Sequence, residues 1–513
     1  MSRHRILLVF VIGCLSACGF APLDWWPITL LALALLIDSV HRASRTHDAF
    51  ILGLVFGVGH FLVGLNWIAT AFSYQSNMPA WLGWVSVVLV SSYMALFPAT
   101  CCLISWRLAA RQHIAFAFTF SALWMLGEWL RGSLLTGFAW DPIGMVWLDL
   151  PSIAHAARWI GIYGLSGLTL LISGLLVPGR RWGWLPALAI ATLLLVAGVW
   201  PATTQLPATQ VYSASAIPIR VVQPNIGQDQ KYDPARAEHD ETIYASLSGP
   251  PSPTPRLLLW PEGALLHYLE LEPDALANVT ALLGAQEVLL TGGPSVTLDP
   301  NGGDDDIYRN SVYAVDSAGT LLWRYDKAHL VPFGEYLPLR PILSRIGVSR
   351  LLPGDLDFTA GPGPRSFQLA NFNVAGRPVS VGVQICYEII FSGRVIDESH
   401  RPSFLFNPSN DAWFGAWGPP QHLAQARMRA IEEGVPVIRA TPNGISALID
   451  PSGTVIASVA RRTSGVIDGF IPDPLPRTFF ARFGLFASLG FGLVLFCTGL
   501  IVRAQAWQEP VGN

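Results

Sequence analysis

The stretch "VGVQICYEIIF", residues 381–391, places a lone cysteine and a carboxylate at the end of an apolar run. The run begins at residue 378, and its β-branched residues predict a buried strand. Cys386, Tyr387 and Glu388 follow where an ordinary buried strand would simply turn. Because α/β folds build their sites at strand ends, the stretch predicts an α/β domain with a candidate site at Cys386.

The chain around this strand is unusually apolar. Of its 513 residues, 51% are hydrophobic and only 13% are charged, whereas soluble domains carry roughly 25% charged residues. The exception is the block 202–475, which holds 28 of the 35 acidic residues and 19 of the 32 basic ones. Its net charge of −9 predicts a water-facing domain, and the lack of a basic cluster argues against a nucleic-acid partner.

The rest of the chain predicts membrane helices, because a span needs about 20 apolar residues. About eight spans are expected, at 6–22, 27–41, 50–72, 79–106, 113–130, 160–178, 183–201 and 478–502. Arginines fall at the N-terminus, in every second loop and after the last span, so the positive-inside rule places both termini in the cytoplasm. This predicts a membrane part (1–201), an extracytoplasmic domain (202–475) and a final helix with a tail (476–513).

The start of the chain allows a second interpretation. "LSAC" at 15–18 follows a basic start and an apolar run, as a lipoprotein processing site would. Six further spans are expected before the large domain, whereas a signal peptide leaves a soluble chain. The pattern therefore favours an ordinary first span.

Six cysteines are present, and five of them fall in predicted spans, where a thiol is usually a small apolar filler. Only Cys386 lies in the extracytoplasmic block, so a disulfide within that block has no second cysteine. An unpaired thiol in an oxidising compartment is a liability. Cys386 is therefore either an inert buried thiol or a nucleophile.

Two more strands of the block end in charged residues. The strands most expected to be central are 217–227, 256–263, 287–296, 378–388 and 403–413, with hairpins at 310–327 and 446–459 and a helix at 421–434. Together they predict an α/β sandwich. Glu262 ends the second of these strands and Lys327 ends the first hairpin. The chain has 30 arginines but only two lysines, so a lysine at this position suggests a need for a compact ammonium.

A carboxylate, an ammonium and a thiol form a chemically complete set. A thiol reacts near neutrality only with help from a base or a cation. The carboxylate can accept the thiol proton, and the ammonium can stabilise a thiolate or a tetrahedral oxyanion. The eleven histidines show no ligand spacing, so neither a metal nor another cofactor is expected.

Glu262, Lys327 and Cys386, in this order, resemble the Glu–Lys–Cys triad of the nitrilase superfamily. Longer motifs resemble, within it, the apolipoprotein N-acyltransferase family of bacterial inner membranes: "WPEG" (260–263), "YDKAHLVPFGEYLPL" (325–339), "ICYEIIF" (385–391) and the stretch 410–447. The resemblance covers essentially the whole chain. It implies an α-helical polytopic membrane domain with a nitrilase-like αββα sandwich inserted before the last span.

The resemblance also implies roles. Cys386 would be the nucleophile, Glu262 the general base and Lys327 the oxyanion stabiliser. Supporting residues would be Glu335 as a second acid that orients the lysine, Tyr387 and Glu388 in substrate access, Asn310 as a site asparagine, and Tyr232 where family members can have tryptophan. Each supporting residue has a plainer alternative: a turn cap for Glu335, a turn residue for Asn310 and a core residue for Tyr387.

The activity implied is a two-step transfer. A phospholipid, with phosphatidylethanolamine and its sn-1 chain expected, would acylate Cys386. The thioester would then acylate the α-amino group of the diacylglyceryl-cysteine of an apolipoprotein. A multi-pass monomer in the bacterial inner membrane is expected, with its catalytic domain periplasmic. The apolar loops 73–80 and 138–151 are expected to be either a lipid portal or plain interfacial loops.

Two other functions fit part of the pattern. A membrane-bound amidase of the nitrilase type would use the same triad, but water would resolve its thioester. A transporter or lipid receptor would need no triad, and an ion-coupled one would carry buried charged pairs in its spans. Glu128 and Asp141 are the nearest such residues, and both are expected to be interfacial.

Overall fold

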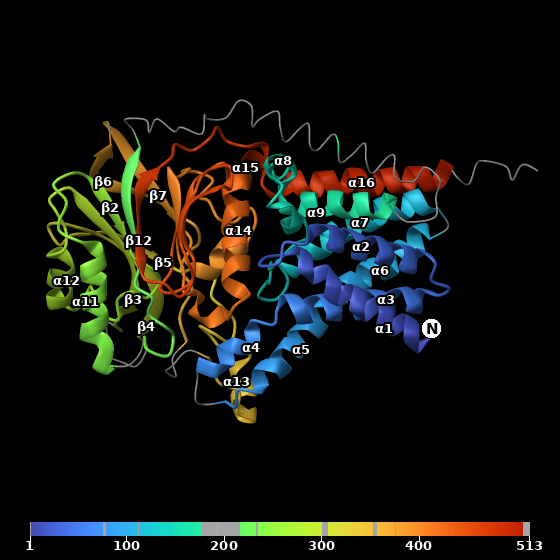
Figure 1. Ribbon diagram of the computed structural model, residues 1–513, viewed down its shortest axis with the longest axis horizontal. Coiled ribbons are helices and arrows are strands. Elements are labelled where there is room, and N and C mark those ends of the chain that lie inside the picture. The colour runs from blue at the N-terminus through green and yellow to red at the C-terminus, as the bar shows by residue number, and fades with distance from the viewer. Residues whose placement is uncertain are drawn as a thin grey trace, which may run out of the picture. The chain divides into compact units, whose positions relative to one another are not determined.

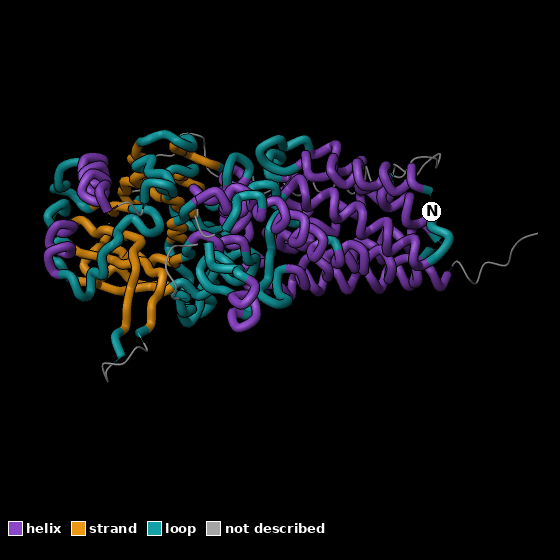
Figure 2. The backbone as a smooth tube through the Cα atoms, turned by 90° about the horizontal axis from the view of Figure 1, so that it is seen from below, coloured by secondary structure: helices purple, strands orange, loops and turns teal. Residues whose placement is uncertain are grey.

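The computed structural model describes residues 2–74, 78–110, 112–176, 192, 216–231, 234–299, 306–351, 357–374 and 376–505. The chain forms two compact units. A helical unit comprises residues 1–69, 81–205 and 477–513, and an α/β unit comprises residues 70–80 and 206–476. The described strands all belong to the second unit (Figure 2).

The helical unit is a bundle of apolar helices (Figure 1). Its described helices are α1 (Arg3–Ser16), α2 (Trp26–His41), α3 (Thr46–Gly64), α5 (Leu82–Met94), α6 (Leu96–Ala109), α7 (His113–Arg131), α8 (Pro151–Ala154), α9 (Ala157–Leu175), α15 (Phe479–Phe483) and α16 (Leu485–Gln505). The short α4 (Ile68–Ala71) and the 3₁₀ turn η2 (Phe72–Tyr74) follow α3 in the chain. Only Ala95 separates α5 from α6, and the two form one apolar stretch, Leu82–Ala109, with Pro98 in the first turn of α6, where proline is tolerated.

Four stretches are long and apolar enough to cross a membrane: Thr46–Gly64, Leu82–Ala109, Ala157–Leu175 and Leu485–Gln505. They overlap the predicted spans 50–72, 79–106, 160–178 and 478–502. The predicted spans 6–22, 27–41 and 113–130 coincide with α1, α2 and α7, which are shorter or less apolar. The predicted span 183–201 lies outside the described residues, so the count of eight stays a prediction.

The surface of the helical unit is what a lipid environment requires. Large apolar side chains are exposed along its helices, including Leu8 on α1, Leu89 on α5 and Phe486 on α16. Trp25 and Trp81 are also more than half exposed beside helix ends, where tryptophan suits a membrane interface. Exposed apolar surface of this extent in water would be unfavourable, so these faces are suited to contact lipid.

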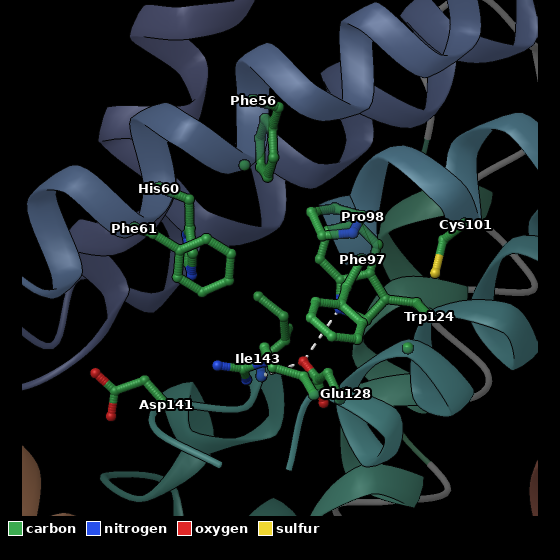
Figure 3. A pocket seen from close by; sticks show the side chains of 13 residues that line it. Phe56, His60, Phe61, Phe97, Pro98, Cys101, Trp124, Glu128, Asp141 and Ile143 are labelled. Carbon is green, nitrogen blue, oxygen red and sulfur yellow. Dashed lines mark hydrogen bonds between the residues drawn. The ribbon is translucent and has the colours of Figure 1, made fainter. Parts of the chain in front are cut away.

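The segment after α7 turns back into the bundle instead of forming a surface loop. Residues 139–148 are all buried, and within them lies the 3₁₀ helix η3 (Ile143–Trp147). Glu128 Oε1 accepts hydrogen bonds from the Trp124 indole at 3.1 Å and from the Ile143 N–H at 2.9 Å (Figure 3). The Arg131 guanidinium donates to the Trp140 carbonyl at 2.7 Å. The apolar side chains of 139–148 therefore pack inside the unit, which argues against a lipid portal there.

Glu128 and Asp141, which were expected to be interfacial, are enclosed by protein. Both are buried and line a small pocket together with His60 and Arg131 (Figure 3). Charged side chains pointing into a bundle interior are usually paired or hydrogen-bonded. Glu128 and Arg131 form hydrogen bonds with the main chain of residues 140–143, and these bonds attach the buried segment to α7.

The α/β unit contains two six-stranded sheets. The first has the order β12-β1-β2-β3-β4-β5 and the second β11-β10-β9-β8-β7-β6. The strands are β1 (Ile217–Gln223), β2 (Arg256–Leu259), β3 (Glu287–Thr297), β4 (Ile307–Asp316), β5 (Leu321–Asp326), β6 (Ser366–Val374), β7 (Arg377–Val383), β8 (Phe404–Pro408), β9 (Val437–Ala440), β10 (Ser446–Ile449), β11 (Val455–Val459) and β12 (Gly465–Ile471). In each sheet three parallel strands lie together, β1-β2-β3 and β7-β8-β9, and antiparallel strands flank them.

Helices cover the outer faces of the two sheets. Helices α11 (Ala237–Ser248) and α12 (Pro273–Thr280) pack on the first sheet through Tyr244 and Val279. Helix α14 (Gly418–Glu433) packs on β9 and β10 of the second sheet, and the short α13 (Arg340–Leu343) lies in the connection before β6. The sheets pack on each other through contacts such as the stacked rings of Trp323 and Phe367, whose centroids are 4.6 Å apart. The predicted αββα sandwich is confirmed.

Every strand that the sequence predicted is present. The predicted runs starting at 217, 256, 287, 378 and 403 are β1, β2, β3, β7 and β8, and the two predicted hairpins are β4-β5 and β10-β11. Strands β6, β9 and β12 were not predicted. The predicted helix at 421–434 begins earlier, at Gly418, because its two prolines occupy the first turn of α14.

Candidate active site

The ends of β2, β5 and β7 bring the three predicted triad residues together. Glu262 follows β2, Lys327 directly follows β5, and Cys386 follows β7. The two sheets meet face to face, so the first sheet supplies the carboxylate and the ammonium while the second supplies the thiol. All three side chains are buried, and the charges of Glu262 and Lys327 both act on the Cys386 thiol.

Lys327 lies between two carboxylates. Its Nζ is 2.9 Å from Glu335 Oε1 and 3.4 Å from Glu262 Oε1, and its side chain is 1% exposed. The Asn310 amide, from β4, donates to the same two oxygens, at 2.7 Å to Glu262 and 2.8 Å to Glu335. Glu262 and Glu335 are thus joined by two shared donors, which fixes the position of both acids.

Close packing of the main chain holds Glu262 in place. Gly263 has a φ of 57°, and a Cβ there would lie 2.5 Å from Lys231 Nζ. On the neighbouring β3, a Cβ on Gly292 would lie 2.7 Å from the Glu262 Cα. The Lys231 ammonium also donates to the Glu262 carbonyl at 3.1 Å. The turn that carries Glu262 therefore requires glycine at both positions.

Cys386 stands in an unusual backbone conformation. It begins the 3₁₀ helix η6 (Cys386–Ile390), and its φ is 51°, in the left-handed region that non-glycine residues rarely occupy. Its carbonyl accepts hydrogen bonds from His422 Nε2 at 3.1 Å and from the Asn407 amide at 3.4 Å. Strained residues of this kind persist where their surroundings over-determine them, and they concentrate at functional sites.

The protonation of the thiol and its neighbour follows from burial and charge. Burial and the nearby negative charge of Glu262 raise the pKa of the Cys386 thiol well above its ordinary value, against the opposing effect of Lys327. Burial also raises the pKa of Glu262, but Lys327, Lys231 and the hydrogen bonds from Asn310 and Cys386 outweigh it, so that pKa is lowered. At neutral pH the pair is therefore a thiol beside a carboxylate, with its single proton on sulfur.

The ammonium remains charged. Burial lowers the pKa of Lys327, but the charges of Glu335, Glu262 and Cys386 raise it more strongly, and the result lies above the ordinary value. A positive charge is thus held beside the thiol in a site from which water is largely excluded. This is the arrangement that stabilises a developing oxyanion.

Glu388 connects both halves of the site. Its Oε1 accepts from the Tyr325 hydroxyl at 2.9 Å and from the Ala328 N–H at 2.7 Å, on either side of Lys327. Its Oε2 accepts from the Ile385 N–H at 2.6 Å, just before Cys386. Burial raises the pKa of Glu388 to about 7, although Lys327 and these N–H donors oppose the rise.

The remaining predicted residues lie as follows. The Tyr387 ring is buried against His329 and Phe391. Glu335 does cap its turn, because its Oε2 accepts from the Val331 N–H at 2.8 Å, but its other oxygen bonds Lys327 and Asn310. Tyr232 lies outside the described residues. Within the part of the chain that the structure describes, no group of three histidine, cysteine or acidic side chains could hold a metal ion.

Comparisons with known proteins agree across the whole chain. Residues 12–175 match the family described as apolipoprotein N-acyltransferase N-terminal domain, and residues 220–473 match carbon-nitrogen hydrolase. Apolipoprotein N-acyltransferase of Rhodopseudomonas palustris is 35% identical over 504 residues, which cover 94% of this chain and 92% of that protein. The protein of the same name from Bradyrhizobium diazoefficiens is also 35% identical, covering 94% of this chain and 91% of its own.

The chain belongs to the apolipoprotein N-acyltransferase family. It is a bacterial membrane protein with a nitrilase-like domain. Among solved structures it is similar to Nit3 of Saccharomyces cerevisiae, a member of branch 10 of the nitrilase superfamily. That likeness has 20% identity and a TM-score of 0.35, and it covers 51% of this chain and 91% of Nit3.

Several buried residues around the triad of this apolipoprotein N-acyltransferase family member were not predicted from the sequence. Lys231 was noticed only as the second lysine, and its contact with Glu262 was not foreseen. Asp411, His422 and Arg439 form a buried cluster behind Cys386. Within 421–434, the polar residues His422, Gln425, Arg429 and Glu432 recur at helical spacing on a buried face, a pattern that could have drawn attention to them.

Replacing Lys327 with arginine tests whether the site of this family member needs a compact ammonium or only a positive charge. The charge is kept, but a planar guanidinium is wider than an ammonium and must fit between Glu262 and Glu335 in a fully buried site. We expect Lys327→Arg to form acyl-enzyme about a hundredfold more slowly or worse, as for loss of an oxyanion donor. The rate is measured by intact mass after mixing with phospholipid. A rate near that of the unmodified protein would mean that Lys327 supplies only a background charge.

Proposed function

We propose that this protein transfers an acyl chain from a phospholipid, through a thioester on Cys386, to the α-amino group of the diacylglyceryl-cysteine of an apolipoprotein. The observation that carries the proposal is the buried set of one thiol, one hydrogen-bonded carboxylate and one ammonium, in a chain whose helical unit is suited to lipid. The family's name supplies the acceptor. Phosphatidylethanolamine, cleaved at sn-1, is the donor we propose.

In the first step, Cys386 Sγ attacks the ester carbonyl carbon of the phospholipid. The S–C bond forms as Glu262 takes the thiol proton, and the negative charge on the carbonyl oxygen is stabilised by Lys327. When the tetrahedral intermediate collapses, the ester C–O bond breaks and Glu262 returns the proton to the departing oxygen. The products are a lysophospholipid and an acyl-Cys386 thioester.

In the second step, the free amine of the lipoprotein attacks the thioester carbonyl. The N–C bond forms, the C–S bond breaks, and the amine gives a proton to Glu262, which passes it to sulfur. Both steps use one base and one oxyanion stabiliser, so a single site serves a donor and an acceptor in turn. This alternation is the ping-pong pattern expected of a covalent intermediate.

The supporting residues have distinct parts in this scheme. Glu335 and Asn310 hold Lys327 and Glu262 in register, as their shared hydrogen bonds suggest. Glu388 positions the chain on both sides of the reacting groups, and we assign to Tyr387 a place beside the path of the substrate. Tyr232 is proposed to give an aromatic contact to the lipid.

The proposed location follows from the charge pattern and from both substrates being lipids. The protein would lie in the inner membrane with both termini cytoplasmic and residues 202–475 on the periplasmic side, between a membrane part (1–201) and a last helix with its tail (476–513). It is proposed to act as a monomer. Of the two apolar loops, residues 73–80 are the one we propose for lipid access. Tyr74 in this loop packs edge-on against Trp413, which belongs to the same unit, with 5.9 Å between the ring centroids.

A single experiment separates an acyltransferase from an amidase-type hydrolase. A transferase must keep its thioester from water until the amine arrives, and a buried site does so by excluding water. We expect phospholipid alone to yield a long-lived acyl-enzyme, one acyl chain heavier, with one lysophospholipid released per protein. A diacylated lipopeptide with a free N-terminus should discharge it, whereas the N-acetylated lipopeptide should not.

The matched control is Cys386→Ser, which should form no adduct because Glu262 is a weak base for an alkoxide. Continuous release of free fatty acid without any amine would establish a hydrolase and overturn the proposal. So would full N-acylation by the serine variant, since Cys386 would then have no part in the reaction.

The pH dependence of acylation tests the direct transfer of the thiol proton to Glu262. The pKa of Cys386 is raised and that of Glu262 is lowered. At any pH between these two pKa values, the two side chains together hold one proton, and that proton is on sulfur. Attack with transfer of that proton to Glu262 is then independent of pH. We expect the single-turnover rate of acyl-enzyme formation to be flat from about pH 7.5 to 9, above the pKa of Glu388. A tenfold rise per pH unit would instead mean that a thiolate forms by losing its proton to water.

A further inference from the structure

Helix α14 presents a buried polar face to the segment that carries the nucleophile. Although α14 is buried along almost its whole length, His422, Arg429 and Glu432 lie on its inner side. The Arg429 guanidinium donates to the Ile390 carbonyl at 3.2 Å, at the last residue of η6. His422 reaches the first residue of η6, Cys386. Burying such polar groups is unfavourable unless they are hydrogen-bonded, so this face has a purpose other than packing.

The contact between His422 and Cys386 has a defined direction. Nε2 of the ring lies 3.1 Å from the Cys386 carbonyl oxygen, which can only accept, so Nε2 carries a proton and donates it. The Asn407 amide of β8 donates to the same oxygen at 3.4 Å. The carbonyl is thus held from two elements, α14 and β8.

The ring itself is fixed from its other side. Nδ1 of His422 lies 2.8 Å from Asp411 Oδ1, which can only accept, and 3.0 Å from Arg439 Nη2, which can only donate. Nδ1 therefore donates to Asp411 when the ring is protonated and accepts from Arg439 when the ring is neutral. Arg439, on β9, donates to both oxygens of Asp411 at 2.6 Å and to the Asn407 side chain at 2.6 Å. These side chains are fully buried, so each depends on the others for its hydrogen bonds.

We propose that His422, held by Asp411 and Arg439, is a positioning residue that keeps Cys386 in its reactive backbone conformation by donating a hydrogen bond to the Cys386 carbonyl. The inference rests on the proposed function of Cys386 as the nucleophile. A non-glycine residue in the left-handed region is in an unfavourable backbone conformation and needs such support. Without it, the backbone of Cys386 relaxes and Sγ moves away from Glu262 and Lys327.

Two substitutions of His422 separate positioning from a merely structural role. His422→Gln can place an amide N–H close to the position of Nε2, whereas His422→Leu fills the space without a donor. We expect His422→Leu to form acyl-enzyme about tenfold to a hundredfold more slowly, because small misplacements of reacting groups have effects of that size. His422→Gln should recover most of the rate. The phospholipid concentration at half-maximal rate should stay the same in both.

The measurement is the single-turnover rate of Cys386 acylation by phosphatidylethanolamine vesicles, per folded full-length protein in detergent. Ser446→Ala is the matched control, because it removes a buried hydroxyl that bonds Gln223 and Thr441 in the α/β unit and, among the residues that the structure describes, makes no hydrogen bond with Cys386, His422 or Asp411. It should lower the unfolding temperature but leave the acylation rate unchanged. This control shows whether lost stability alone slows the reaction.

The inference is overturned if folded His422→Leu is acylated at the unmodified rate, or if His422→Gln is no faster than His422→Leu. It is also overturned if Ser446→Ala is slowed as much as His422→Leu. Should His422→Leu not fold, His422→Gln and Asp411→Asn are compared, and an unmodified rate in Asp411→Asn contradicts the inference. The variant Cys386→Ser distinguishes failure of this inference from failure of the proposed function. If Cys386→Ser were acylated, Cys386 would not be the nucleophile, whatever the His422 variants show.

Discussion

The site depends on one electrostatic constraint: two buried carboxylates beside a thiol must be compensated by ammonium groups. Lys327 meets Glu335 and Glu262 at 2.9 and 3.4 Å, with almost no access to water, and Lys231 adds a second positive charge beside Glu262. Removing Lys327 would leave both carboxylates without their shared cation, which is strongly destabilising. These charges lower the pKa of Glu262, and burial with the charge of Glu262 raises that of Cys386, so the proposed reactive pair is held as a carboxylate beside a protonated thiol.

This arrangement is possible because two sheets of similar design meet face to face. Each has three parallel strands at its centre, and the site residues come from the ends of those strands or from their immediate neighbours. The first sheet contributes the charged groups, while β7 and η6 contribute the strained cysteine. Glu388 spans the two halves, since its carboxylate accepts from the chain beside Lys327 and from the residue before Cys386.

Much of this could be predicted from the sequence, and the reasons are specific. Central strands such as β7 are continuous apolar runs that end in polar residues, so both the sandwich and the triad positions could be read directly. Strand β12 escaped prediction because its pattern is set by pairing with a strand distant in the chain: the whole of β12 pairs with β1, about 250 residues earlier. Strands β6 and β9 also escaped prediction, although they pair with the next strands in the chain, β7 and β10.

What the sequence could not give is the direction of buried polar side chains. Glu128 and Asp141 were expected at the interface because they lie near span ends, yet the segment after α7 turns inward and buries them. His422 and Arg439 lie in a motif used for the family resemblance, but nothing local indicates that His422 reaches the Cys386 carbonyl or that Arg439 contacts the His422 ring. These contacts arise only from tertiary structure, through groups on α14, β8 and β9.

The central claim is that a phospholipid acyl chain becomes covalently attached to Cys386. It is tested most directly by incubating the full-length protein with phosphatidylethanolamine, digesting it, and locating the acyl group by tandem mass spectrometry. The account predicts a single acylated peptide, with the acyl group on Cys386 and removable by neutral hydroxylamine, as a thioester requires. An acyl group on any other residue, or lysophospholipid release with no acyl group on Cys386, would contradict it.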